Sequence, residues 1–179
     1  IADGGLVLMT ARSASALMGS LVKNSGTVQA QTIANKNGRI LLIGDMSSGT
    51  TQVDGKLNAS APNGGDGGFI ETSAAKVNVA DTAVVTTLSK SGKTGNWLIE
   101  PYDFYVASSG GNITGTALGT ALNSTDVTSQ TFETDAPTVT GAAVSSSSYT
   151  SGSGNIYVND AVVWTSANSL TLNAYKNIY

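Results

Sequence analysis

Residues 63–81 read Asn63-Gly-Gly-Asp-Gly-Gly-Phe-Ile-Glu-Thr-Ser-Ala-Ala-Lys-Val-Asn-Val-Ala-Asp81. In this stretch a glycine-rich turn is followed by a short apolar strand, a corner of small residues and a second strand. The same order of features occurs before it and after it. A repeated unit this thin cannot bury its own apolar face, so the repetition predicts units stacked on one another as a solenoid.

Two series of strand signals advance together along the chain. In the first, a glycine or asparagine pair precedes a short apolar strand, at successive steps of 33, 30 and 28 residues. In the second, a turn residue precedes each strand, at steps of 29 and 26 residues. Such spacing predicts coils of roughly 30 residues with two or three strands each. The first series is marked by Gly5, Gly38, Gly68 and Asn96, with a later member at Asn155, and the second by Gly26, Gly55 and Asp81.

The apolar pattern within the strands predicts one buried face and, in places, a covered outer face. Apolar and polar residues alternate around Val53, Leu57 and Ala59, as in a strand with one buried and one solvent-exposed face. Residues 6–9 and 40–43 are apolar on both faces and require a cover. The helical spacing of apolar residues in 13–22, with Ser13 as N-cap, predicts a short flanking α-helix as that cover. A weaker helical pattern covers residues 116–123.

The remaining segments complete an all-β chain that we interpret as a single β-solenoid segment over residues 1–179. Residues 124–153 are rich in serine and threonine, and we expect an inserted loop or irregular hairpin there. The chain begins and ends in strand-like sequence, so we expect a segment of a longer protein.

Composition argues against several classes of function. Charged residues make up 12% of the chain, the net charge is −3, and lysine and arginine form no cluster, so we expect no nucleic-acid partner. The chain contains no apolar run near the roughly 20 residues that span a bilayer, so we expect no membrane span. Cysteine and histidine are absent, which removes thiolate metal sites and the commonest general base. No cofactor is expected.

Three motifs carry a resemblance to a known family. They are residues 35–40 (Asn-Lys-Asn-Gly-Arg-Ile), 67–74 (Gly-Gly-Phe-Ile-Glu-Thr-Ser-Ala) and 95–104 (Gly-Asn-Trp-Leu-Ile-Glu-Pro-Tyr-Asp-Phe). Together they resemble filamentous-haemagglutinin-type exoproteins, including high-molecular-weight adhesins, over residues 1–123 and 154–179. These are large Gram-negative virulence adhesins exported by two-partner secretion.

The resemblance implies a right-handed parallel β-helix rod that is secreted and exposed at the cell surface. It implies two partners: an outer-membrane two-partner secretion transporter during export, and a receptor or glycan on a host or bacterial cell. We therefore expect a structural and adhesive stalk segment without catalysis. The alternatives are a stalk that presents a distal toxin or binding domain, and a β-helical polysaccharide-active enzyme.

Acidic residues provide the candidates for chemistry, each with a structural alternative. Glu100 and Asp103 are a possible glycosidase pair, but Glu-Pro-Tyr-Asp also suits a turn between strands, and we favour the turn. Asp66 lies within Gly64–Gly68, which is faintly like calcium-binding glycine and aspartate repeats. Because the motif occurs once, we favour a corner turn and expect no metal.

Aromatic residues and sequons provide the candidate surface contacts. Trp97, Tyr102, Phe104 and Tyr105 form either a sugar-stacking platform or, as we favour, a core pair with the two tyrosines at the rim. Tyr102 and Tyr105 are thus the candidate contact residues. The possible glycosylation sites are the sequon asparagines Asn58, Asn112 and Asn123, with Asn58 expected on an outward strand face.

Overall fold

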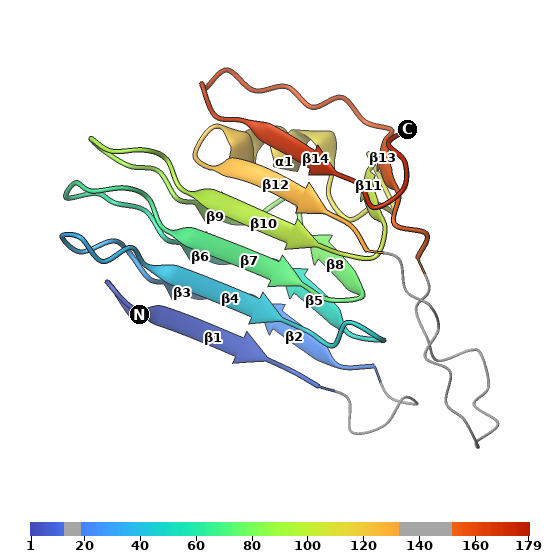
Figure 1. Cartoon of the computed structure of the whole chain (residues 1–179), viewed down its shortest axis with the longest axis horizontal. Coiled ribbons are helices and arrows are strands. Elements are labelled where there is room, and N and C mark those ends of the chain that lie inside the picture. Colours follow the sequence, from blue (N-terminus) through green and yellow to red (C-terminus); the bar gives the residue numbers. More distant parts are fainter. Residues whose placement is uncertain (13–18, 133–151) are drawn as a thin grey trace.

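A computed structural model describes residues 1–12, 19–132 and 152–179, and it shows the predicted right-handed parallel β-solenoid (Figure 1). The largest sheet, here called the first face, consists of parallel strands in the order β1-β4-β7-β10-β12-β14. Its strands are β1 (Leu6–Thr10), β4 (Arg39–Ile43), β7 (Phe69–Ser73), β10 (Asn96–Glu100), β12 (Asp126–Gln130) and β14 (Leu170–Asn173).

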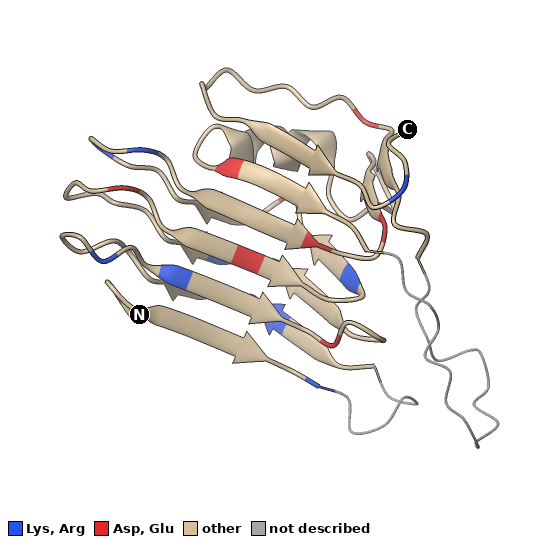
Figure 2. Cartoon of the chain, viewed as in Figure 1, with Lys and Arg blue, Asp and Glu red and all other residues tan. Residues whose placement is uncertain are grey.

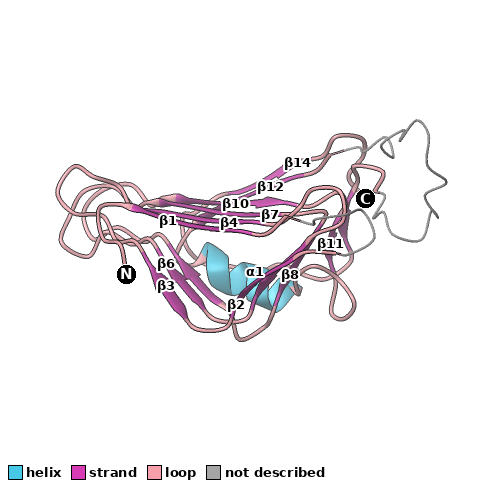
Figure 3. Cartoon of the chain, turned by 90° about the horizontal axis from the view of Figure 1, so that it is seen from below, coloured by secondary structure: helices cyan, strands magenta, loops and turns pink. Residues whose placement is uncertain are grey.

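Two smaller parallel sheets complete a triangular cross-section around a shared core (Figure 3). Each of the first three coils gives one strand to each face, so every coil covers the core of the next. The second face contains β2 (Leu21–Asn24), β5 (Thr50–Val53) and β8 (Lys76–Val79). The third face contains β3 (Thr27–Gln29), β6 (Lys56–Asn58) and β9 (Val84–Thr86).

The strands that follow Gly38, Gly68 and Gly95 lie directly above one another, as the repeat spacing predicted. Ile40 of β4 is in register with Ile70 of β7, and Ile70 with Trp97 of β10. All three side chains point inward and are fully buried. Their stacking replaces a central globular core, and burial of each such side chain contributes roughly 1.5–3 kcal/mol.

Glycines at the coil corners allow the backbones of neighbouring coils to approach closely. A Cβ atom on Gly67 would lie 1.8 Å from the carbonyl oxygen of Thr87, and one on Gly95 would lie 1.9 Å from that of Gly68. Any larger side chain would therefore push adjacent coils apart. The glycine-rich turn that defines the repeat is a packing requirement between rungs.

The helix predicted at residues 13–22 is wrong where the structure describes it. Residues 13–18 lie outside the described part of the chain. Leu21 and Val22 begin strand β2, with Val22 buried and Leu21 exposed, because β2 pairs in parallel with β5. No helix in the described residues covers the outer side of β1, where Leu6 and Leu8 remain 50% and 54% exposed.

The weaker helix prediction is confirmed by α1 (Gly115–Leu122). The hydroxyl of Thr114 caps it by accepting the N–H of Ala117 at 3.1 Å. Its apolar side is buried against β9 and β12, and in Figure 3 it lies between the first face and the smaller sheets. Within the described residues, no helix has the length and apolarity that a bilayer crossing requires.

The prediction of a loop over residues 124–153 is wrong for its first part. Residues 126–130 form β12, which pairs with β10 and β14 on the first face. The alternation of buried Val127 and Ser129 with Thr128 is a strand pattern made largely of polar residues. Residues 133–151 lie outside the described part of the chain.

The prediction that the strand after Asn155 belongs to the first series is also wrong. It is β13 (Ile156–Val158), and it pairs with β11 (Phe104–Val106) in a separate sheet rather than joining the first face. A turn followed by an apolar run indicates that a strand forms, but does not identify its partner.

Candidate functional site

Three tyrosines form a stacked ladder on the outside of the β11–β13 sheet. They end the related triplets Asp103-Phe-Tyr105, Asn155-Ile-Tyr157 and Asn177-Ile-Tyr179. The middle residues Phe104 and Ile156 are fully buried, whereas Ile178 is 52% exposed. The ring centroids of Tyr105 and Tyr157 are 4.5 Å apart with planes 6° from parallel. Those of Tyr157 and Tyr179 are 5.0 Å apart and 13° from parallel. We call these three side chains the tyrosine ladder.

The first residues of the first two triplets, Asp103 and Asn155, bond to the coil above. The carboxylate of Asp103 accepts the backbone N–H groups of Ser153 and Asn155, at 3.0 and 2.8 Å. The side-chain oxygen of Asn155 accepts the N–H of Asn177 at 3.1 Å. The amides of Asn155 and Asn177 also donate to the hydroxyls of Tyr157 and Tyr179, both at 3.2 Å. The rings are therefore held in place before any partner arrives.

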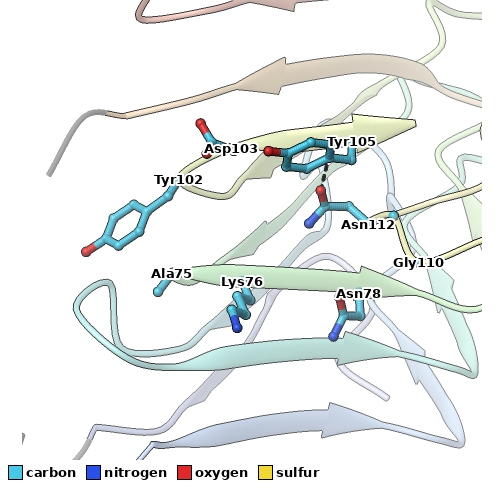
Figure 4. A pocket seen from close by; sticks show the side chains of 9 residues that line it. Ala75, Lys76, Asn78, Tyr102, Asp103, Tyr105, Gly110 and Asn112 are labelled. Carbon is cyan, nitrogen blue, oxygen red and sulfur yellow. Dashed lines mark hydrogen bonds between the residues drawn. The ribbon is translucent and has the colours of Figure 1, made fainter. Parts of the chain in front are cut away.

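A cleft lies beside the ladder because β11 does not pair with β8, the strand of the coil below. Asn112, in the turn after β11, bridges the gap instead. Its side-chain oxygen accepts the N–H of Tyr105 and its amide donates to the carbonyl of Val77, both at 2.6 Å. The resulting cleft has a volume of about 450 Å³, with Asn112 at its back (Figure 4).

The cleft joins an aromatic wall to polar groups on β8. Lys76 and Asn78 alternate with buried Val77, so both side chains point outward on the same side of the strand. Neither side chain makes a hydrogen bond or ion pair with another described residue, and both are exposed. Tyr105 lies across the cleft from them and is 37% exposed.

The hydroxyl of Tyr105 stays protonated well into the alkaline range. Burial raises the pKa of Tyr105 above its ordinary value, and the nearby negative charge of Asp103 and the neighbouring Tyr157 raise it further. Tyr105 therefore acts as a neutral hydrogen-bonding group at physiological pH.

The structure separates the four predicted aromatic residues. Trp97 and Phe104 are fully buried, as the favoured core interpretation predicted. Tyr102 is only 4% exposed and Tyr105 is 37% exposed, and the contact role of both stays a prediction. Sequence reasoning missed Lys76, Asn78 and the two upper ladder tyrosines. The repeated Asn-Ile-Tyr triplet at 155 and 177 was the signal for the ladder.

The predicted carboxylate pair is not brought together. Asp103 is engaged by backbone N–H groups at a corner, as the turn interpretation predicted. Glu100 lies on the outer side of the first face, where the hydroxyl of Ser73 donates to Glu71 at 2.9 Å and to Glu100 at 3.2 Å. Burial raises the pKa of Glu100, and the negative charge of Glu71 raises it further.

The glycine-rich turn around Asp66 forms a corner. The carboxylate of Asp66 accepts the backbone N–H of Lys93, in the next coil, at 2.8 Å. Side chains of the types that hold metals do not gather in groups of three or more within residues 1–12, 19–132 and 152–179. Acidic and basic residues are scattered along the described stack (Figure 2).

The sequon asparagines differ in accessibility. Asn58 lies between the inward-facing Leu57 and Ala59, so its side chain is on the outward side of the strand as expected, but it is only 7% exposed. Its side-chain oxygen accepts the N–H of Ser60 at 3.1 Å. Asn112 is buried and its amide is engaged by Val77, which also argues against modification there. Asn123 is exposed at the end of α1 and stays a predicted glycosylation site.

The described lining of the cleft is aromatic at Tyr102 and Tyr105 and polar or charged at Lys76, Asn78, Asp103 and Asn112. No protein-family model, curated protein or solved structure matches the chain. Function is therefore inferred from the residues and from the surfaces that they build.

Proposed function

We propose that this chain is a structural and adhesive β-solenoid stalk segment of a secreted, surface-exposed Gram-negative adhesin, which mediates cell attachment without catalysis. It leaves the cell through an outer-membrane transporter of the two-partner secretion type and contacts a receptor or glycan on a host or bacterial cell. The exposed tyrosine ladder is the observation that carries this proposal.

The ladder has the properties of a contact surface. Tyrosine combines a large apolar ring with a polar tip, and it is enriched where proteins bind partners. The rings of Tyr105, Tyr157 and Tyr179 are already stacked, so little side-chain entropy is lost when a partner binds. The parallel rungs beneath them form a firm support.

The resemblance to filamentous-haemagglutinin-type exoproteins supports the exported location. Two of its motifs, residues 67–74 and 95–104, contain β7 and β10, which are adjacent rungs in register. Two of the three motifs that carry the resemblance thus lie on neighbouring rungs of the solenoid.

Adherence of coated beads tests the proposal. Beads carrying the whole chain are expected to attach to cultured epithelial cells or to Gram-negative bacteria more than beads carrying albumin. The double variant Tyr105→Ala/Tyr179→Ala is expected to reduce attachment. Leu88→Ala, which removes an exposed apolar side chain on another part of the surface, is the matched control and should leave it unchanged. Attachment no better than that of albumin contradicts the proposal.

One observation favours a second candidate, a polysaccharide-active enzyme. Glu71 and Glu100 reach the same Ser73 hydroxyl, and the pKa of Glu100 is raised. A close carboxylate pair with one raised pKa is the arrangement of retaining glycosidases. Release of reducing ends from a polysaccharide panel, abolished by Glu100→Gln and by Glu71→Gln, would support this candidate. No release from any substrate of the panel would count against it.

A further inference from the structure

We propose that the cleft between β8 and β11 binds one pyranose ring of a glycan, and that this ring carries a carboxylate. The inference rests on the proposed adhesive function and names the ligand class for it. The site consists of the ring of Tyr105, the amide of Asn78 and the ammonium group of Lys76, with Asn112 as the supporting back wall (Figure 4).

Tyr105 supplies the apolar wall that a sugar ring needs. Tyr157 stacks on one face of the Tyr105 ring, with planes only 6° apart. The opposite face is therefore directed away from the ladder, toward the coil that contains β8 and toward the cleft. A pyranose has one face of C–H groups that packs on an aromatic ring, while its hydroxyls remain at the edge for hydrogen bonds.

Asn78 and Lys76 supply the polar groups on the opposite side. The amide of Asn78 both donates and accepts, as a sugar hydroxyl does. Lys76 lies two residues away on the same side of β8, and its charge is not paired with any described carboxylate. A carboxylate on the sugar matches this charge, and a lysine recognises it as a point charge without strict geometry.

The other polar groups of the cleft are already engaged. The carboxylate of Asp103 accepts backbone N–H groups from Ser153 and Asn155, and both ends of the Asn112 side chain bond to backbone. These residues build the walls and leave the amide of Asn78 and the ammonium of Lys76 for the ligand. Among the described residues that line the cleft, Lys76 alone is positively charged, so the carboxylate of the sugar is placed on the β8 side of the cleft, away from the carboxylate of Asp103.

The cleft has the size and the fixed shape of a small-molecule site. Its volume of about 450 Å³ falls within the range of roughly 300–1,000 Å³ found for such sites. Because Asn112 bonds to the strands on both sides, the distance between Tyr105 and β8 is set before binding. A preformed site avoids the ordering cost that weakens flexible sites.

An NMR titration of the whole chain tests the site with a matched pair of probes, methyl β-D-glucuronide and methyl β-D-glucoside. The glucuronide is expected to shift the side-chain amide signal of Asn78 and the ring signals of Tyr105. The glucoside is expected to bind about fivefold more weakly, the effect of one partly exposed ion pair. Lys76→Gln should reduce glucuronide affinity to the level of the glucoside, and Asn78→Ala should weaken both sugars.

The controls separate the cleft from general charge effects and from misfolding. Lys56→Gln removes an exposed lysine from the third face and should leave both affinities unchanged. The side chains of Lys76 and Asn78 are exposed and unbonded to other described residues, so their variants should keep the backbone amide spectrum of the wild type. Absence of shifts in the cleft, equal affinity for the two sugars, or unchanged affinity in Lys76→Gln would each overturn the inference.

The two proposals fail in different ways. If coated beads attach to cells while the glucuronide leaves Asn78 unshifted, the adhesive function stands and the sugar site is rejected. If the glucuronide binds in the cleft while coated beads do not attach, the sugar site stands and the adhesive function is rejected.

Discussion

Trp97 shows how a single large side chain is accommodated between rungs. It is fully buried, and its indole N–H donates to the hydroxyl of Thr72, one coil below, at 3.0 Å. Thr72→Val keeps the shape of the side chain but leaves this buried N–H without its acceptor. We expect a loss of about 1–3 kcal/mol in the free energy of unfolding, measured by urea denaturation.

A double variant separates the hydrogen bond from packing. In a Trp97→Phe background the donor is absent, so Thr72→Val should cost less than it does in the wild type. Thr171→Val on the exposed side of β14 is the surface control and should change the free energy of unfolding by less than about 0.5 kcal/mol. Equal losses from Thr72→Val in both backgrounds would show that the indole bond does not stabilise the fold.

Glu100 gives the chain a pH dependence of defined sign. Its pKa is above its ordinary value of 4.5 in the folded chain, so the folded state keeps this proton to a higher pH than the unfolded chain does. The contribution of Glu100 to stability is therefore full below pH 4.5 and is lost as the pH rises through the folded pKa. Urea denaturation across this pH range should show that the free energy of unfolding of the wild type falls as the pH rises. The Glu100→Gln variant should not show this fall.

Asp54 provides the control of opposite sign. A hydrogen bond from Lys23 lowers the pKa of Asp54, so its contribution is present above pH 3.8 and is lost as the pH falls through the lower folded pKa. Asp54→Asn should therefore leave the fall in the free energy of unfolding above pH 4.5 unchanged. Parallel profiles for the wild type and Glu100→Gln would contradict the assignment to Glu100.

At the scale of an element, the glycine turns determine how closely coils stack. Gly95→Ala would place a Cβ 1.9 Å from the backbone oxygen of Gly68, so the adjacent coils must separate. We expect a loss of about 1–3 kcal/mol, as for other overpacked sites. Gly26 has open space around its Cβ position, and Gly26→Ala should be neutral or stabilise by about 0.4–1 kcal/mol. Thermal unfolding of the two variants checks the contrast, and similar midpoints would contradict it.

The strands that the sequence predicted well share a strong local signal. The strands after Gly38, Gly68 and Gly95 each combine a glycine corner with a series of inward-facing apolar residues. Stacking of the coils requires both features, because the corners must approach closely and the inward side chains must be buried. Strand β12 was missed because its partners β10 and β14 stabilise a segment rich in serine and threonine. Leu21 and Val22 fitted a helical spacing as well as a strand alternation, and pairing with β5 decided between them.

The candidate site was less predictable than the fold because it depends on a break in pairing. Tyr105 was identified as a surface contact from its position in an aromatic cluster. The cleft exists because Asn112 bridges β8 and β11 where a direct ladder would have closed the gap. No local pattern around Lys76 or Asn78 indicates that break, since both residues occupy ordinary outward strand positions.

At the scale of the whole molecule, the chain is a stack in which each coil is stabilised mainly by its immediate neighbours. The paired strands run in register from β1 to β14, with β7 held between β4 and β10. Among the described strands, β1 pairs with β4 alone, and its Leu6 and Leu8 are half exposed. In such a linear array, stability is a sum of coil and interface terms, and the outer coils open first.

Hydrogen exchange on the isolated chain tests this organisation. Backbone amides of β7 should exchange more slowly than those of β1, because β7 loses pairing on two sides when it opens. Ile70→Ala, which removes a fully buried side chain from β7, should cost about 2–5 kcal/mol and speed exchange in β4 and β10 as well. Met9→Ala on β1, where the side chain is half-buried, should cost less and affect exchange mainly in β4. Equal protection of the backbone amides from β1 to β14, lowered uniformly by both variants, would contradict this organisation. It would mean that coupling extends across the whole stack and that the chain unfolds as a single cooperative unit.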